Sequence, residues 1–150
     1  MLTYPILTAV DLGKVLPEFQ GFISDLRFYI GLFLLIGPLV MLTLGAWMFF
    51  KPIKTPTYKA GYRTYFGMGS KNAWRFAQWL AGLIWGGLGA LLTVLMIIVC
   101  IVFSTMELQA AVSAAITWLV IEVVAALVAF LVIEAVVAFR FDKNGRARVK

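Results

Sequence analysis

Hydrophobic residues in this chain form three long runs that are separated by shorter polar segments. The runs cover residues 28–50, about 76–106 and about 108–139, and the first two contain no charged side chain. A transmembrane helix needs roughly 20 apolar residues to cross the hydrocarbon core of a bilayer. The pattern therefore predicts an all-α fold, a polytopic membrane protein with three transmembrane helices.

The three runs divide the chain into an outer segment at 1–27, a membrane domain at 28–139 with a polar loop at 51–78, and a tail at 140–150. In the outer segment apolar side chains recur at helical spacing, which is typical of an amphipathic helix at the membrane surface. The same spacing also fits an outward extension of the first span. These apolar residues are Leu16, Phe19, Phe22, Ile23 and Leu26.

Positive charge is concentrated in two segments that three crossings place on the same side of the membrane. The loop 51–78 carries six basic residues and no acidic one, and the tail carries five basic residues against Asp142. Cytoplasmic segments are enriched in Lys and Arg. We therefore expect the N-terminus outside, the C-terminus in the cytoplasm, and contacts between the basic residues and anionic lipid headgroups.

Composition argues against several classes of function. The chain has no histidine, and its single cysteine, Cys100, lies inside an apolar run. No metal or haem site, catalytic triad or nucleotide-binding glycine motif is indicated. We predict no cofactor, no metal and no enzyme activity. The net charge is +6, and most of the basic residues lie in segments beside the apolar runs. This placement is typical of residues that set membrane topology, and it argues against direct nucleic-acid binding.

Small residues mark the helix faces that we expect to pack against protein. Gly82 and Gly86 form a GxxxG pair, a pattern that lets helix backbones approach closely in lipid. On the third run a stripe of small residues includes Glu122, which predicts that Glu122 faces a neighbouring helix. We expect these faces to support a homo-oligomer. The stripe consists of Ala111, Ala115, Trp118, Glu122, Ala126 and Ala129.

Glu122 is a candidate functional residue because a carboxyl group inside a membrane span is costly and often functional. One interpretation is a contact for a ligand or a proton, or an element of a pore. The other is a protonated side chain that is hydrogen-bonded to a helix backbone, to Thr93 or to Thr117.

The loop contains the second candidate site, Gly61-Tyr62-Arg63-Thr64. An arginine between an aromatic ring and a hydroxyl group, after a turn glycine, suits two-point binding of a carboxylate or phosphate. Glu134 lies about 8 Å from the basic end of the third run by the helical rise, so it is the acidic residue that Arg63 can reach.

After the loop we predict an interfacial helix that continues into the second span. Ser70 is its expected N-cap, Lys71, Arg75 and Gln78 share a polar face, and Trp74 lies at headgroup depth. In the first span, Gly37-Pro38 predicts a bend.

The pattern of Gly61-Tyr62-Arg63-Thr64, then Trp74, Phe76-Ala77 and Trp85, resembles the loop and following helix of the SdpI family. The resemblance covers about residues 30–105. The family is named for a bacterial immunity protein against a secreted peptide toxin, and this chain resembles the C-terminal half of that six-span protein. Where family members often have asparagine before the glycine and after Phe-Ala, this chain has Ala60 and Gln78.

The resemblance implies a multi-pass protein of the bacterial cytoplasmic membrane that confers immunity or resistance to a membrane-active peptide toxin. It also implies signalling by recruitment of a cytoplasmic regulator, because the founding member captures a repressor at the membrane. Two alternatives remain. One is a small oligomeric transport or channel component that uses Glu122, and the other is a scaffold subunit of a larger membrane complex.

Overall fold

The computed structural model describes residues 12–148 and consists of three long helices and one short 3-10 helix. The elements are α1 (Leu12–Phe50), η1 (Gly67–Gly69), α2 (Lys71–Phe103) and α3 (Leu108–Arg140). Each long helix contains a segment that is long and apolar enough to cross a membrane. The predicted all-α, three-span fold is confirmed.

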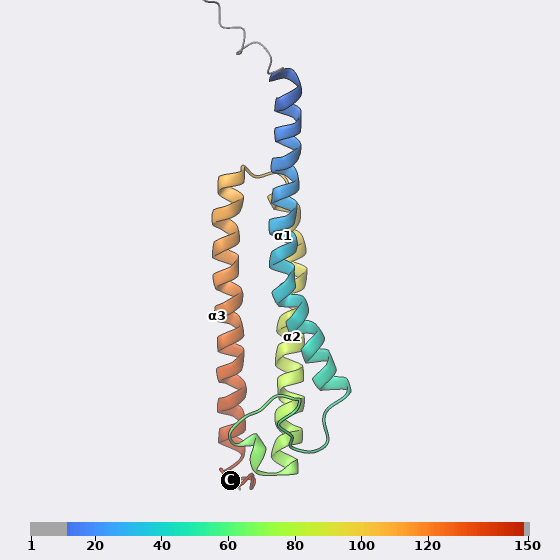
Figure 1. The fold of residues 1–150 in the computed structure, drawn as a ribbon. Helices are drawn as coiled ribbons and strands as arrows, with labels where there is room; N and C mark the ends of the chain where they lie inside the picture. The colour runs from blue at the N-terminus through green and yellow to red at the C-terminus, as the bar shows by residue number, and fades with distance from the viewer. Residues whose placement is uncertain (1–11, 149–150) are drawn as a thin grey trace, which may run out of the picture.

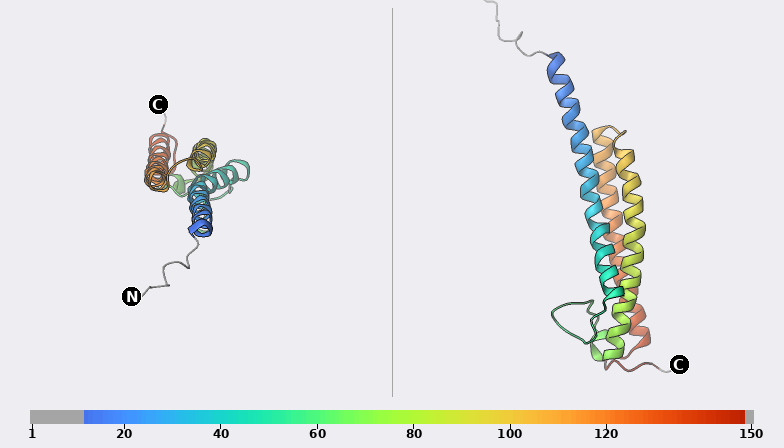
Figure 2. Two further views of the ribbon diagram at one scale, coloured as in Figure 1. Left: turned by 90° about the horizontal axis from the view of Figure 1, so that it is seen from above. Right: turned by 90° about the vertical axis from the view of Figure 1, so that its right-hand side faces the viewer.

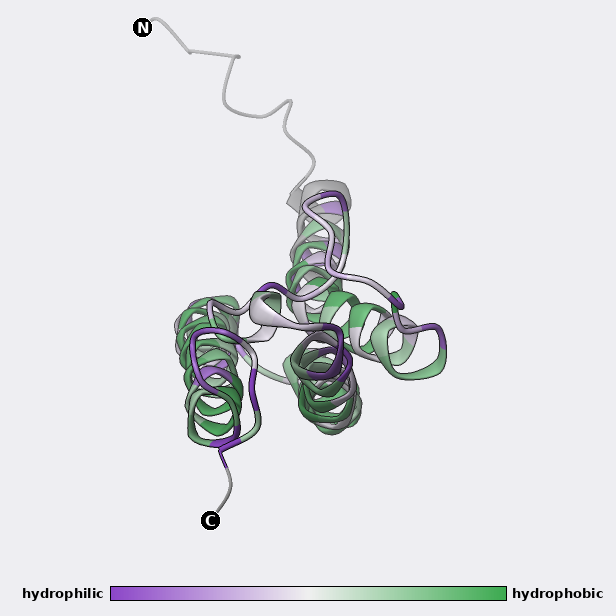
Figure 3. Cartoon of the chain, turned by 90° about the horizontal axis from the view of Figure 1, so that it is seen from below, coloured by the Kyte–Doolittle hydropathy of each residue, from purple (hydrophilic) through white to green (hydrophobic). Residues whose placement is uncertain are grey.

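The three helices run side by side, with the loop and the tail at one end and the turn between α2 and α3 at the other (Figure 1). The loop and the C-terminal tail therefore share one end, as three crossings require. Viewed from that end, hydrophilic residues gather in the loop and the tail, while the helices are mainly hydrophobic (Figure 3).

The outer segment is continuous with the first span, because α1 runs from Leu12 to Phe50 without interruption. Its first turns extend past the turn between α2 and α3 (Figure 2). Phe22 is exposed and Leu26 is half-buried. Residues 1–11 and the side chains of Leu16, Phe19 and Ile23 lie outside what the structure describes. Within α1, Arg27 donates hydrogen bonds to the main-chain carbonyls of Met106 and Ser104 in the turn between α2 and α3.

The bend predicted at Gly37-Pro38 is present, since the last turns of α1 lean away from the direction of its earlier part (Figure 1). Proline lacks an N–H and crowds the preceding turn, so the carbonyl of Leu34 loses its usual helical donor. The bend directs the end of α1 across α2.

Glycines bring the backbones of α1 and α2 into close contact where the two helices cross. A Cβ atom on Gly45 would lie only 2.1 Å from the backbone nitrogen of Gly86, and one on Gly82 would lie 2.6 Å from that of Phe49. No side chain fits at such separations. We call this contact the glycine seam, defined by Gly45, Gly82, Gly86 and Gly89.

The glycine seam lies within one chain, so it does not serve the expected contact between copies. A Cβ atom on Gly89 would lie 2.4 Å from the backbone nitrogen of Leu42 of α1, whereas nothing lies within 4 Å of one on Gly87. The glycine face of α2 is covered by α1 over this stretch. Homo-oligomerisation stays a prediction, and it needs a different surface.

Helix α3 is held mainly near its two ends and packs less extensively than α1 does on α2. At the loop end, Ile133 and Val137 join a hydrophobic cluster with residues of α1 and α2 such as Met48 and Ala77. At the other end, Ala111 joins a second cluster that contains Leu34 and Phe103. Between the two clusters the buried residues of α3 are Glu122 and Ala129.

The tail folds back as a small turn that packs against the start of α2. Asp142 accepts hydrogen bonds from the backbone N–H groups of Asn144 and Arg146, and an isolated bridge pairs Phe141 with Ala147. Gly145 has a φ of +71°, a left-handed conformation that glycine adopts without a Cβ penalty.

Candidate functional site

Three of the four motif residues in the loop are used to fold the loop onto α2. Gly61 has a φ of +101°, and a Cβ atom there would lie 2.9 Å from the ring of Trp74. The hydroxyl of Thr64 accepts a hydrogen bond of 2.7 Å from the N–H of Gly67 at the start of η1. Tyr62 is half-buried, and Arg63 alone of the four is exposed.

Gln78 joins the loop to α2 through a two-point amide contact with Tyr62. The side-chain oxygen of Gln78 accepts from the Tyr62 N–H at 3.0 Å, and its nitrogen donates to the Tyr62 carbonyl at 2.6 Å. Gln78 is completely buried. The predicted polar face that Gln78 shares with Lys71 and Arg75 is therefore wrong for Gln78, because loop backbone occupies its two hydrogen-bonding groups.

Trp74 anchors the beginning of the loop in the same way. Its ring is completely buried, and its indole N–H donates a hydrogen bond of 2.7 Å to the carbonyl of Ile53. The loop covers the ring, and the depth of Trp74 at the lipid headgroups stays a prediction. The helix predicted after the loop is the first part of α2, and its N-cap is Ser70 as predicted, with the Ser70 hydroxyl accepting from the N–H of Ala73 at 3.1 Å.

The ring of Tyr62 lies between α2 and α3 and contacts one aromatic residue on each helix. Its centroid is 6.4 Å from that of Trp85 and 6.1 Å from that of Phe130. A cavity of about 380 Å³ beside these rings is also lined by Trp47 and Met48 of α1. Within residues 12–148 the buried hydroxyl of Tyr62 and the buried indole N–H of Trp85 have no hydrogen-bond partner.

Glu134 lies near Tyr62, and the predicted pair with Arg63 is wrong. Burial, with a smaller contribution from the Glu134 carboxylate, raises the pKa of the Tyr62 phenol above its ordinary value. Arg63 is exposed, and no ion pair joins it to Glu134 in the part of the chain that the structure describes. The loop turns the Arg63 side chain outward while it directs Tyr62 toward α3.

Glu122 lies about halfway along α3 and faces α1, as the stripe of small residues predicts. It is buried, with 7% of its surface exposed, and a Cβ atom on Gly37 would lie 2.9 Å from its Oε2 atom. The missing side chain at Gly37 thus leaves room for the carboxyl group beside the bend of α1. Among the described residues the buried Oε1 atom has no hydrogen-bond partner.

The threonines that were candidate partners of Glu122 form other hydrogen bonds. Thr93 donates to the carbonyl of Gly89 within α2, and Thr117 donates to that of Ser113 within α3. Both are ordinary bonds to the preceding helical turn. The interpretation of Glu122 as a residue satisfied by Thr93 or Thr117 is therefore wrong for this arrangement.

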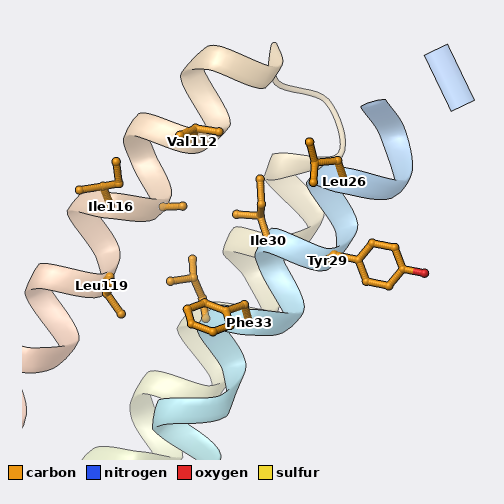
Figure 4. A pocket seen from close by; sticks show the side chains of 9 residues that line it. Leu26, Tyr29, Ile30, Phe33, Val112, Ile116 and Leu119 are labelled. Atoms are coloured by element: carbon orange, nitrogen blue, oxygen red, sulfur yellow. The ribbon is translucent and has the colours of Figure 1, made fainter. Parts of the chain in front are cut away.

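An apolar groove lies between α1 and α3 on the side of Glu122 away from the loop (Figure 4). Its volume is about 360 Å³. Leu34 and Leu119 line the groove, and Gly37 and Glu122 each lie three residues further toward the loop, or about 4.5 Å along their helices. We call it the outer groove. Its lining consists of Leu26, Tyr29, Ile30, Phe33, Leu34, Val112, Ala115, Ile116 and Leu119.

Sequence reasoning missed the outer groove, the amide contact of Gln78 and the role of the tail at Ser70. The Ser70 hydroxyl donates a hydrogen bond of 2.7 Å to the carbonyl of Gly145. Signals existed for two of these features: a lone glutamine among apolar residues in α2, and the turn residues Asn144-Gly145 in the tail. Across the described chain, no group of three or more His, Cys, Asp or Glu side chains gathers to hold a metal ion.

Comparison with known proteins places the loop, α2 and most of α3 in one family. The model of the SdpI/YfhL protein family matches residues 54–135, more than half of the chain. The matched region contains all four motif residues of the loop together with Glu122 and Glu134. No similar curated protein and no similar solved structure were found.

Proposed function

The chain belongs to the SdpI/YfhL protein family, and from this premise we propose that it protects its host against a membrane-active peptide by capturing the peptide within the bilayer. The family and the three apolar helices make it a multi-pass membrane protein. Immunity, the bacterial cytoplasmic membrane and an outward-facing N-terminus are the further parts of this proposal.

The observation that carries the proposal is the outer groove and the polar groups at its base. The groove has an apolar lining and the length of about two helical turns, which suits the apolar side chains of a short amphipathic helix. It lies toward the end of the bundle that we propose faces outside, where a secreted peptide would arrive. Because α3 is packed less tightly than α1 and α2, its separation from α1 can adjust to a ligand.

Two polar groups at the base of the groove give the site a means to select peptides. One is the Glu122 carboxyl group, whose Oε1 atom lacks a partner, and the other is the Leu34 carbonyl, which Pro38 deprives of its helical donor. A buried polar group without a partner costs about 1–3 kcal/mol. A ligand that supplies a hydrogen bond there recovers this cost, whereas a purely apolar lipid chain does not.

A growth assay with a deletion strain tests the proposal. We expect deletion to lower the inhibitory concentration of at least one amphipathic peptide in a panel, and wild-type protein to restore it. Ala115→Phe should fail to restore growth because the new ring fills the groove. Ala135→Phe, an exposed position of α3 outside the groove, is the matched control and should restore growth.

The assay also has a clear negative outcome. Full protection by Ala115→Phe, with the protein present in the membrane at the wild-type level, would show that the groove does not receive the peptide. Glu122→Gln separates the carboxyl group from the shape of the site, since the side chains are nearly equal in size. We expect its protection to be weaker for peptides with a basic residue and unchanged for neutral ones.

The outward position of Arg63 favours a second role, the recruitment of an acidic cytoplasmic partner. Its neighbours Tyr62 and Thr64 face the protein interior, so the guanidinium group is the part of the motif that another protein can reach. Arg63→Ala should abolish capture of such a partner from host extract, while Lys59→Ala, an exposed cation of the same loop, should leave it intact. Equal capture by both variants would contradict this role.

A further inference from the structure

We infer that the loop end of the bundle holds a binding site for the phosphate group of an anionic phospholipid, formed by Lys51, Lys54 and Arg75. The site is a pocket of about 350 Å³ between the end of α1 and the second turn of α2. It lies apart from the outer groove and from the Tyr62 cavity, and shares no lining residue with either. Its lining consists of Phe50, Lys51, Pro52, Ile53, Lys54 and Arg75.

The two walls of this pocket are fixed to one another. One wall is the short segment after α1, whose Ile53 carbonyl accepts the hydrogen bond of 2.7 Å from the indole of Trp74. The other wall carries Arg75, the residue next to Trp74 on α2. At the start of the segment, the N–H of Lys51 donates to the carbonyl of Trp47 at 2.9 Å. The backbone therefore holds the three cations around one space.

The chain supplies no counter-ion for these cations. Residues 28–106 contain no Asp or Glu, and no ion pair involves Lys51, Lys54 or Arg75 in the part of the chain that the structure describes. Asp142, an acidic residue at the same end, is engaged by the backbone of its own turn. An anion from outside the chain is therefore the group that can neutralise this pocket.

The chemistry of the pocket favours a phospholipid over a free anion. Arg offers a planar fork for two phosphate oxygens and Lys offers point charges. Beside them stand apolar groups, with Phe50 at 77% exposure and the rings and chains of Pro52 and Ile53. A headgroup joined to acyl chains uses both kinds of surface at the end of a membrane span, whereas inorganic phosphate uses the cations alone.

Native mass spectrometry of the full-length protein in detergent tests this inference. The probes are a phosphatidylglycerol, a phosphatidylcholine with the same acyl chains, and inorganic phosphate as a competitor. Wild-type protein should bind phosphatidylglycerol in preference to phosphatidylcholine. The variant Lys51→Gln/Lys54→Gln/Arg75→Gln should lose roughly tenfold or more of its affinity for phosphatidylglycerol. Excess inorganic phosphate should not displace the bound lipid.

A control with the same change in net charge separates a site from general attraction. Lys59→Gln/Lys143→Gln/Arg148→Gln removes three exposed cations at the same end, and we expect it to keep nearly the wild-type affinity. Equal losses in both triple variants would overturn the inference in favour of diffuse attraction. Equal binding of the two lipids, or displacement by inorganic phosphate, would overturn it as well. Because all six side chains are exposed, both variants should fold.

Discussion

The contact between α1 and α2 and the contact between α1 and α3 differ in almost every respect. At the glycine seam the two backbones meet, and Gly45, Gly82 and Gly89 leave no room for even one added carbon atom. Between α1 and α3 the facing side chains leave the outer groove, with a volume of about 360 Å³. In lipid, association of helices depends on close packing and hydrogen bonds. The first contact is thus the stable one, and the second is the one that can admit a ligand.

A small membrane protein can thus combine a rigid frame with a separate binding site. Two helices fixed by a glycine seam provide a frame, and the third helix is attached near its ends by two hydrophobic clusters. The stretch between the clusters contains Glu122. Stability and binding are therefore assigned to different pairs of helices, which substitutions can test separately.

The largest loss of stability is expected from a substitution in the glycine seam. Gly45→Leu places a side chain where the nearest backbone atom of Gly86 would be 2.1 Å from the new Cβ atom, so α1 and α2 must separate. We expect the free energy of unfolding to fall by several kcal/mol. This is above the usual range of about 1–3 kcal/mol for overpacking, because rigid backbone is displaced. Thermal unfolding in detergent measures it. Gly87→Leu, which meets nothing within 4 Å, is the control, and equal behaviour of the two variants would contradict the seam.

A substitution between α1 and α3 is expected to change the free energy of unfolding in the opposite direction. Glu122→Met replaces a buried carboxyl group that has an unpartnered oxygen with an apolar side chain of similar length. We expect the free energy of unfolding to rise by about 1–3 kcal/mol, together with a loss of peptide protection. Unfolding in detergent and the growth assay measure the two effects. Glu107→Met, in the exposed turn, is the control. A destabilised Glu122→Met protein would mean that the carboxyl group stabilises the helix pair.

A smaller effect is expected from the pH dependence of the contact that Tyr62 makes with α3. Since the pKa of Tyr62 is raised in the folded protein, the folded state holds the phenolic proton to higher pH than the unfolded state. The stabilisation is complete below about pH 10 and is lost as the pH rises above it. Tyr62→Phe should show a shallower decline of stability in that range than wild type. Tyr65→Phe, an exposed ring, should decline as wild type does, and identical curves for all three proteins would refute the effect.

The smallest effect on stability is expected from filling the outer groove. Ala115→Phe should change the free energy of unfolding by less than about 1 kcal/mol, because open space receives the ring. Ala111→Phe, one turn away but completely buried in a cluster, should be strongly destabilised. Unfolding of both variants in the same detergent provides the comparison. If both lose similar stability, the groove is packed as tightly as the cluster.

Much of the fold follows from the sequence because the bilayer imposes strong rules on it. The lengths of the apolar runs predict three spans, and Gly37-Pro38 predicts the bend. Ser70 predicts the start of α2 because it precedes a helical pattern. The stripe of small residues correctly orients Glu122. Each of these conclusions depends on residues that are close in sequence or on the period of one helix.

The candidate site was less predictable because its contacts join residues that are far apart in the chain. Gln78 satisfies the backbone of Tyr62, and Trp74 satisfies that of Ile53. Helical periodicity assigns each side chain to a face, but it does not say that a loop covers that face. The fold of the loop also decides that Tyr62 points inward and Arg63 outward. Arg63 therefore does not form the expected pair with Glu134.

The hydrogen bond between Ser70 and Gly145 has a consequence for the order in which the protein is made. Ser70 is the N-cap of α2, and its partner Gly145 is synthesised 75 residues later, after α3. The hydrogen bond that joins the start of α2 to the tail therefore forms only after all three helices have been synthesised. A truncation should therefore keep the turn at Phe141–Ala147, since that turn supplies the partner of Ser70.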